Sequence, residues 1–268
     1  MIGTLARRLY LSLVAVFLVA PLVIVGSVSF NSQARMNFPP QHPSLIWYRV
    51  FFTDPGWMSA FALSIVVASL AALVAGSIAL PIAYAVWRYR SRAAIALQAA
   101  ARVSFLLPSI VVSIVFLAFW SSIGHAGYIE DTILSHGIVF VTLPLAMIGL
   151  GFAAIDPALI EAARTMGARD SEVLHTVIRP IVLPYILSGL IFVFILSLNE
   201  YIIAYMVAGF EVETLPIKVF NNLRMGFTPT MCVGAVLFLL LEILGFGTIA
   251  LIGDLPKLLG ARESHGSK

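Results

Sequence analysis

Six long apolar stretches, separated by short polar segments, constrain this chain more than any other feature of its sequence. Each is close to or above the length of about 20 residues that an α-helix needs to cross the hydrocarbon core of a membrane. The stretches run approximately over residues 9–30, 59–87, 103–123, 137–155, 185–208 and 231–253. The pattern predicts an all-α membrane protein with six transmembrane helices.

The composition supports this prediction. Hydrophobic residues make up 60% of the 268 residues and charged residues 11%, against about 25% charged in soluble proteins. The net charge of +3 does not indicate nucleic-acid binding, because the basic residues are scattered between the apolar stretches. The first stretch follows Arg7 and Arg8 as a secretory signal would, but it exceeds the usual signal core of about 7–15 residues. We therefore interpret it as an uncleaved span.

The basic residues predict the orientation of the spans. Cytoplasmic segments of membrane proteins carry an excess of Lys and Arg, and an alternation of six spans places 12 of the 16 basic residues on one side. The four on the other side are Arg35, Arg49, Lys218 and Arg224. Both termini and the segment 156–184 are therefore predicted to be cytoplasmic. We expect one transmembrane domain over residues 1–268.

The segment 156–184 is the one long polar stretch in the second half of the chain. Asp156 can cap a helix that has Pro157 at its first position, and Gly167 can close that helix in the left-handed conformation. One face of this helix is apolar, with Leu159, Ala162, Ala163 and Met166 at spacings of three and four.

A second short helix is predicted after that glycine. It begins at Asp170 and should end at Pro180, because proline lacks the amide hydrogen that an α-helix needs. Its apolar face would consist of Val173, Leu174, Val177 and Ile178.

Motifs of catalysis and metal binding are missing from the sequence. There is no GxxxxGK[ST], HExxH, CxxC or GxSxG pattern, so we expect neither an enzyme active site nor a metal site. The five histidines, expected to be solvated or interfacial, are His42, His125, His136, His175 and His265.

The polar segment carries a recognisable motif. Glu161-Ala162-Ala163, followed after three residues by Gly167, resembles the EAA---G loop of permease subunits in binding-protein-dependent ABC importers. The loop also lies between the fourth and fifth spans, as in that family. The family pattern ends in Leu-Pro, where this chain has Arg179-Pro180.

The resemblance implies a fold, partners and an energy source. The fold would be that of MetI-like type I permeases, and the chain would lie in the inner membrane of a bacterium. The partners would be a second homologous permease (in a heterodimer, or a homodimer as the alternative), two cytoplasmic ATPases, an extracytoplasmic solute-binding protein and membrane lipid. ATP and magnesium would bind the ATPases, and this chain would bind no cofactor. The residues expected to form the loop that couples to the ATPase are Asp156, Pro157, Glu161, Ala162, Ala163, Gly167 and Ala168.

Further segments resemble the second permease of spermidine/putrescine importers. They are the Trp87–Arg90 segment and the segment from Phe194 to Pro229, within which Leu215–Lys218 and the turn from Gly226 to Pro229 match most closely. Asn31-Ser32 after the first span resembles an asparagine-serine segment common in these permeases. The resemblance implies a polyamine or related cation as the solute. The alternatives are an amino acid derivative, an opine or a phosphonate, or a secondary transporter in place of an ABC permease.

Polar residues within the spans mark a candidate pathway for the solute. Ionisable groups inside a membrane are costly and often functional, and a cation would benefit from carboxylates there. The candidates are Asn199, Glu200, Tyr201, Tyr205 and Glu242. The alternative is that Glu200 and Glu242 only hold helices together.

Overall fold

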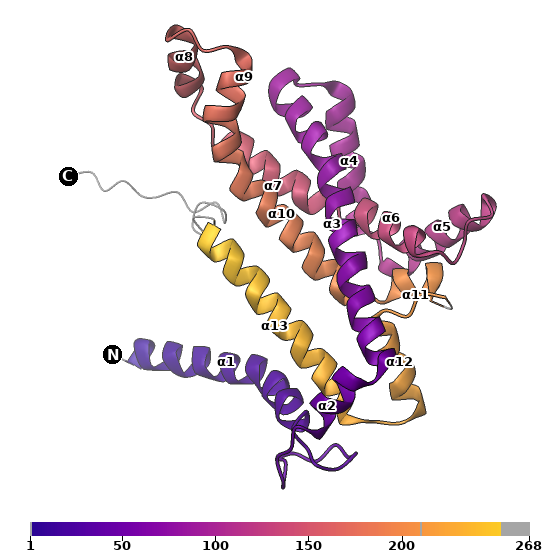
Figure 1. Ribbon diagram of the computed structural model, residues 1–268. Coiled ribbons are helices and arrows are strands. Elements are labelled where there is room, and N and C mark those ends of the chain that lie inside the picture. Colours follow the sequence, from indigo (N-terminus) through magenta and orange to yellow (C-terminus); the bar gives the residue numbers. More distant parts are fainter. Residues whose placement is uncertain (1, 210, 253–268) are drawn as a thin grey trace. The chain divides into compact units, whose positions relative to one another are not determined.

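The computed structural model describes residues 2–209 and 211–252, and in these ranges all regular secondary structure is helical (Figure 1). The helices are α1 (Ile2–Val28), α2 (Ile46–Thr53), α3 (Pro55–Tyr89), α4 (Arg92–Leu106), α5 (Ser109–Ser122), α6 (Ile129–Val139), α7 (Thr142–Ala153), α8 (Pro157–Thr165), α9 (Asp170–Val173), the π-helix η1 (Leu174–Ile178), α10 (Arg179–Asn199), α11 (Ile202–Ala208), α12 (Leu215–Met225) and α13 (Pro229–Ile252). The all-α prediction is confirmed.

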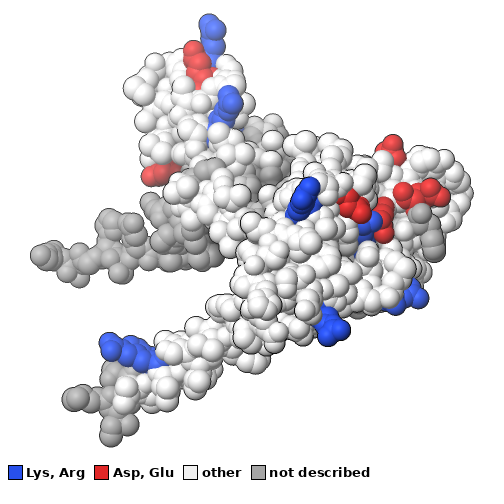
Figure 2. All heavy atoms as spheres, turned by 60° about the horizontal axis from the view of Figure 1, so that its bottom comes forward, with Lys and Arg blue, Asp and Glu red and all other residues white. Residues whose placement is uncertain are grey.

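The described residues contain four to six candidate membrane spans. Four helices are long and apolar enough to cross a membrane, and six spans result if each of two bent helix pairs counts as one. Figure 2 shows that charged side chains take up only a small part of one face of the molecule. The expected first, second and sixth spans correspond to α1, α3 and α13, while the last residue expected in the sixth, Gly253, and the predicted cytoplasmic C-terminus lie outside the described residues.

The third and fourth apolar stretches are not the single straight helices that the sequence suggested. Helices α4 and α5 meet at 114°, and α6 and α7 meet at 44°. The sharper bend lies at Leu107 and Pro108, which both have extended backbone, with ψ angles of 145° and 135°. A residue before proline is forced out of the helical region, and proline itself lacks an amide hydrogen. Pro108 therefore accounts for the break.

The predicted stop at Pro180 is wrong. The helix that begins at Asp170 continues to Asn199, and the five residues before Arg179 form a π-helix in which the Arg179 N–H bonds to the carbonyl of Leu174. The wider turn of the π-helix accommodates Pro180, which has no amide hydrogen. The expected fifth span is instead broken near its other end, where Glu200 has extended backbone between α10 and α11.

The chain divides into two compact units, residues 1–62 with 215–240 and residues 63–214 with 241–268. In the first unit, Phe51 is fully buried and contacts the rings of Trp57 and Phe61 at centroid distances of 5.8 and 5.9 Å. The ammonium of Lys218 lies 5.5 Å from the centroid of Trp57. Helices α2 and α12 in this unit lie in the segments between the predicted spans.

The second unit contains the polar loop and the candidate pathway. Helix α10 packs along α7, and α11 packs on α5 and α6. Glycines on both helices of the first pair allow close contact, because a Cβ at Gly189 would lie 2.8 Å from Pro144 Cα and one at Gly151 would lie 3.0 Å from the side chain of Tyr185. Such small residues let helices approach in membranes, where lipid offers no hydrophobic driving force for their association.

A histidine–aspartate pair closes the turn between α5 and α6. His125 Nδ1 lies 2.6 Å from Oδ1 of the buried Asp131, whose Oδ2 accepts the backbone N–H of Tyr128 at 3.0 Å. The hydrogen bond to Asp131 raises the pKa of His125, and the charge of that carboxylate adds to the effect.

We expect this pair to make stability depend on pH. Because the folded-state pKa is raised, its contribution is fully present below the ordinary histidine pKa of about 6.5. The contribution is lost as pH rises through the folded-state pKa. Thermal unfolding of the purified chain in detergent should show this loss for wild type and not for His125→Gln. The control His42→Gln, at an exposed histidine, should retain the wild-type pH profile; a flat profile for wild type would contradict the prediction.

Candidate functional site: the loop 156–184 and the membrane carboxylates

The first helix of the polar segment, α8, begins as predicted. Asp156 has extended backbone, and its Oδ1 accepts the N–H of Ala158 at 2.9 Å, with Pro157 at the first position of the helix. The Asp156 carboxylate thereby accepts one of the N–H groups of the first turn, which have no acceptor within the helix itself. The cap fixes where α8 begins.

Gly167 ends α8 in the way the sequence suggested. Its φ of +88° lies in the left-handed region, which costs a glycine little. The N–H of Gly167 bonds to Arg164 O at 2.9 Å, and the N–H of Ala168 bonds to Ala163 O at 3.1 Å. These two bonds form a Schellman motif, which satisfies carbonyls that would otherwise be unpaired.

The turn after α8 is also held by side chains. Arg164 Nη2 donates to Asp170 Oδ1 at 2.8 Å, and Glu172 Oε2 accepts the backbone N–H of Arg169 at 2.6 Å. The second contact caps the helix that starts at Asp170. The exposed Arg164–Asp170 pair joins α8 to α9 across Gly167, so the two helices form a defined surface element.

The apolar face predicted for α8 is mostly left uncovered by this chain. Leu159 is 49% exposed and Met166 82% exposed, and Ala162 is exposed as well. Only Ala163 is buried. Glu161 is also exposed. The loop therefore presents an apolar surface with the Glu161 carboxylate beside it.

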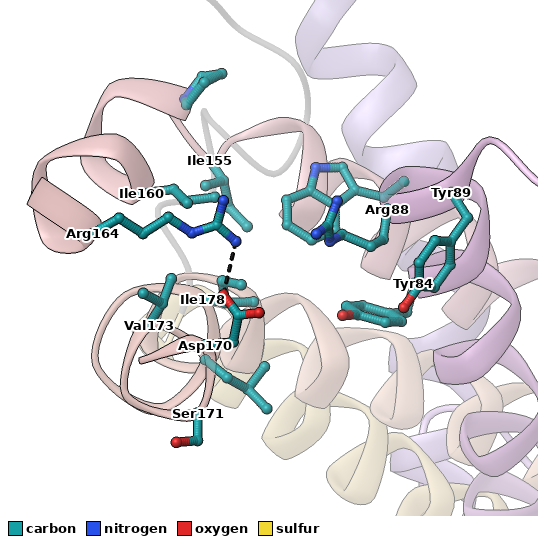
Figure 3. Close-up of a pocket in the computed structure, with 13 residues that line it drawn as sticks. Tyr84, Arg88, Tyr89, Ile155, Ile160, Arg164, Asp170, Ser171, Val173 and Ile178 are labelled. Atoms are coloured by element: carbon teal, nitrogen blue, oxygen red, sulfur yellow. Dashed lines mark hydrogen bonds and ion pairs between the residues drawn. The ribbon is translucent and has the colours of Figure 1, made fainter. Parts of the chain in front are cut away.

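A pocket of about 510 Å³ lies between this loop and the end of α3. Figure 3 shows Arg88 from α3 and Arg164 from α8 reaching into it, with Arg164 paired to Asp170. Trp87 and Tyr84 contribute aromatic surface. No spacing or motif in the sequence connected these residues of α3 with the loop.

Two of the candidate pathway residues lie together. The amide of Asn199 donates to Glu242 Oε1 at 2.6 Å and to the carbonyl of Ile195 at 2.9 Å. Asn199 is exposed and Glu242 is half-buried. This contact joins α10 to α13 and leaves the Glu242 carboxylate accessible at the surface of the unit.

The Glu200 side chain contacts helices α11 and α6. Its carboxylate accepts the backbone N–H groups of Ile202, Ile203 and Ala204 at 2.9–3.1 Å. Its Oε2 also lies 3.2 Å from Nε2 of His136. The Glu200 side chain is 8% exposed and that of His136 1% exposed. Glu200 thus caps α11 and ties it to α6.

The expectation that His136 is solvated or interfacial is wrong. Its Nδ1 lies 2.8 Å from Ser197 Oγ, and its ring is buried between α6 and α10. The separation of 61 positions between His136 and Ser197 explains why no sequence spacing revealed the contact. Tyr201 and Tyr205, also candidates, stack with ring centroids 5.4 Å apart.

A helical chain with several membrane spans and a capped helical loop exposed beyond them defines a polytopic membrane subunit built to contact other proteins. The chain belongs to the family of binding-protein-dependent transport system inner membrane components, whose model matches residues 75–253. It is accordingly an ABC importer permease of the inner membrane. Family membership decides against the secondary-transporter alternative.

Named relatives cover nearly the whole chain. The putrescine transport system permease protein PotI of Escherichia coli is 30% identical over 92% of this chain and 87% of its own length. The spermidine/putrescine transport system permease protein PotC of Haemophilus influenzae is 26% identical over 88% of this chain and 92% of its own length.

Solved structures show the same fold. A bacterial ABC transporter involved in alginate import matches with a TM-score of 0.67 and 17% identity over 94% of this chain and 95% of its own. The MetNI methionine ABC transporter, in inward-facing conformations, matches with a TM-score of 0.60 and 17% identity over 75% of this chain and 100% of its own. The predicted type I permease fold is supported by both.

We expect Glu200 to stabilise the fold. Glu200→Ala removes the acceptor for three backbone N–H groups and the partner of His136, and leaving buried donors unpaired costs about 1–3 kcal/mol. The thermal unfolding temperature of the purified chain in detergent should fall. Glu130→Ala, at an exposed residue, is the matched control and should not change it. Equal unfolding temperatures for wild type and Glu200→Ala would contradict the capping role.

Proposed function

We propose that this permease forms half of the pathway for a polyamine such as putrescine or spermidine. The observation that carries the proposal is the accessible Glu242 carboxylate, held by Asn199 on a surface between apolar helices. A carboxylate at such a position favours a cationic solute. The names of the relatives PotI and PotC support the same solute class.

The proposed topology has six spans with both termini in the cytoplasm. It counts each bent helix pair as one span and follows the distribution of basic residues. The polar segment 156–184 then faces the cytoplasm. Two such permeases, as a heterodimer, would enclose the pathway, and a solute-binding protein would deliver the polyamine from the other side.

The coupling loop of this proposal is the surface formed by α8 and α9, which includes Asp156, Pro157, Glu161, Ala162, Ala163, Gly167 and Ala168. The exposed Leu159 and Met166 would enter a groove of the partner ATPase, and Glu161 would pair with a basic residue there. ATP and magnesium would bind the ATPases, while this chain binds no cofactor. Closure of the ATPases would then move the spans and alternate access to the pathway.

The experiment is uptake of radiolabelled putrescine into vesicles that contain the complete transporter, with the solute-binding protein outside and ATP inside. Uptake should require both ATP and active ATPase. Uptake that persists without ATP would overturn the mechanism. Uptake of a neutral amino acid derivative in place of putrescine would overturn the solute class only.

Reversing the charge of Glu161 should uncouple the permease from its ATPase. For Glu161→Lys we expect uptake to be lost, because the carboxylate is replaced by a cation that repels the proposed basic partner. The chain should still be inserted, since Glu161 is exposed and its side chain is not needed for the caps of α8. Uptake and membrane content of the chain would be measured together, with Glu130→Lys as the control. Normal uptake by Glu161→Lys would exclude this docking contact.

Neutralising Glu242 should weaken polyamine transport selectively. Glu242→Gln retains an oxygen that can accept from Asn199 but removes the charge. A hydrogen bond to a charged group contributes about 1.5–3 kcal/mol. Its loss should therefore raise the KM for putrescine about tenfold or more. The maximal rate of uptake should change less. An unchanged KM would assign Glu242 to helix packing.

A further inference from the structure

A second recess lies beside the loop, at the start of α10. It is an apolar groove of about 620 Å³ between α3, α7 and the junction of η1 and α10. Its walls include Leu80, Pro81 and Tyr84 of α3 and Val182, Leu183 and Ile186 of α10. Leu80 and Leu183 are each 39% exposed, so the groove opens at the surface.

The groove becomes basic toward one end. Along α3, the residues that line the groove end at Tyr84, and those that line the adjoining pocket continue to Arg88. Along α10, the groove residues run back from Ile186 to Arg179. The lengths of helix from Leu80 to Arg88 and from Ile186 to Arg179 are each about 10–12 Å at 1.5 Å per residue. The apolar residues therefore lie at one end of this length, and arginines from both helices lie at the other.

The basic end adjoins the pocket of Figure 3. Tyr84, Leu174 and Ile178 line both recesses. The pocket adds Arg88 and Arg164 to the Arg179 of the groove, and Figure 3 shows the first two reaching into it. One carboxylate, Asp170, lines the pocket and is paired with Arg164. Cationic charge therefore exceeds anionic charge around the junction of the two recesses.

We propose that the groove and pocket together bind one anionic phospholipid. An acyl chain would lie along Leu80, Val182 and Ile186, and the phosphate would accept hydrogen bonds from Arg88 and Arg179. Arginine recognises phosphate through paired N–H donors, and basic pockets between helices at a membrane surface are typical sites for anionic lipid headgroups. Arg179, where the chain departs from the Leu-Pro of its family pattern, thereby acquires a function.

Other ligands fit less well. A soluble anion would leave the apolar part of the groove, along Leu80, Val182 and Ile186, without a partner. A polyamine would be repelled by the arginines. A zwitterionic lipid would bring a positive group to a site that is already cationic. The inference does not depend on which solute the permease imports.

The test is photolabelling of the complete transporter in lipid nanodiscs with a diazirine-bearing phosphatidylglycerol. We expect labelled peptides from the start of α10 and from the second half of α3, identified by mass spectrometry. Unlabelled phosphatidylglycerol should compete at least several-fold better than phosphatidylcholine. Equal competition by the two lipids would overturn the proposal, and so would displacement of the label by inorganic phosphate.

Matched variants separate the two parts of the site. Arg88→Ala with Arg179→Ala should reduce labelling several-fold, whereas Arg92→Ala, an arginine outside both recesses, should not. Leu183→Trp should block the groove, whereas Leu73→Trp, at an exposed leucine of α3 outside it, should not.

Two further outcomes in the assembled transporter decide whether a phospholipid occupies the groove. Labelling of the isolated permease that disappears in the complete transporter would show that a partner subunit covers the groove, and would overturn the proposal. Loss of labelling in the arginine variants while putrescine uptake continues would support it and leave the proposed solute unaffected.

Discussion

Backbone hydrogen bonding in an apolar medium is the constraint on which this structure depends. Inside a membrane no water is available to pair with a free N–H or C=O, so every interruption of a helix must be compensated by the protein. The break between α10 and α11 illustrates this. The three N–H groups that begin α11 all donate to the Glu200 carboxylate, and the charge of that carboxylate is in turn close to His136. A polar residue in an apolar span thus allows the helix to break without leaving donors unpaired.

The interruption at Pro180 is compensated differently. The chain widens into a π-helix, and the helical run continues from Asp170 to Asn199. Proline within a helix costs about 3 kcal/mol or more when its effects are not relieved. The wider turn also brings Leu174 and Ile178 to the walls of both recesses. A local adjustment of the backbone has therefore shaped the surface next to the polar loop.

Local features of the fold could be predicted from the sequence, and long-range ones could not. The caps at Asp156 and Gly167 follow from side-chain chemistry within a few residues, and the helical spans follow from apolar length. The 114° bend could have been expected from Pro108, but its angle is set by packing. Nothing in the sequence indicated that Glu200 meets His136 while its neighbour Asn199 meets Glu242, because these contacts join residues 64 and 43 positions apart. Adjacent polar residues at a helix end point in opposite directions, and only the tertiary structure decides which one stays accessible.

The continuity of the run from α9 through η1 to α10 has a mechanical consequence. Its 30 residues make a rod about 45 Å long, with the Arg164–Asp170 contact at one end and the Glu200 cap next to the other. Hinges concentrate a displacement where a chain bends easily, whereas a rod delivers it undiminished at its far end. In the proposed mechanism, a displacement of α8 would therefore be transmitted along the rod to Asn199 and its partner Glu242. The π-helix and Pro184, which lies inside α10, are the places along the rod where the backbone hydrogen bonding departs from a regular α-helix and therefore where its stiffness is set.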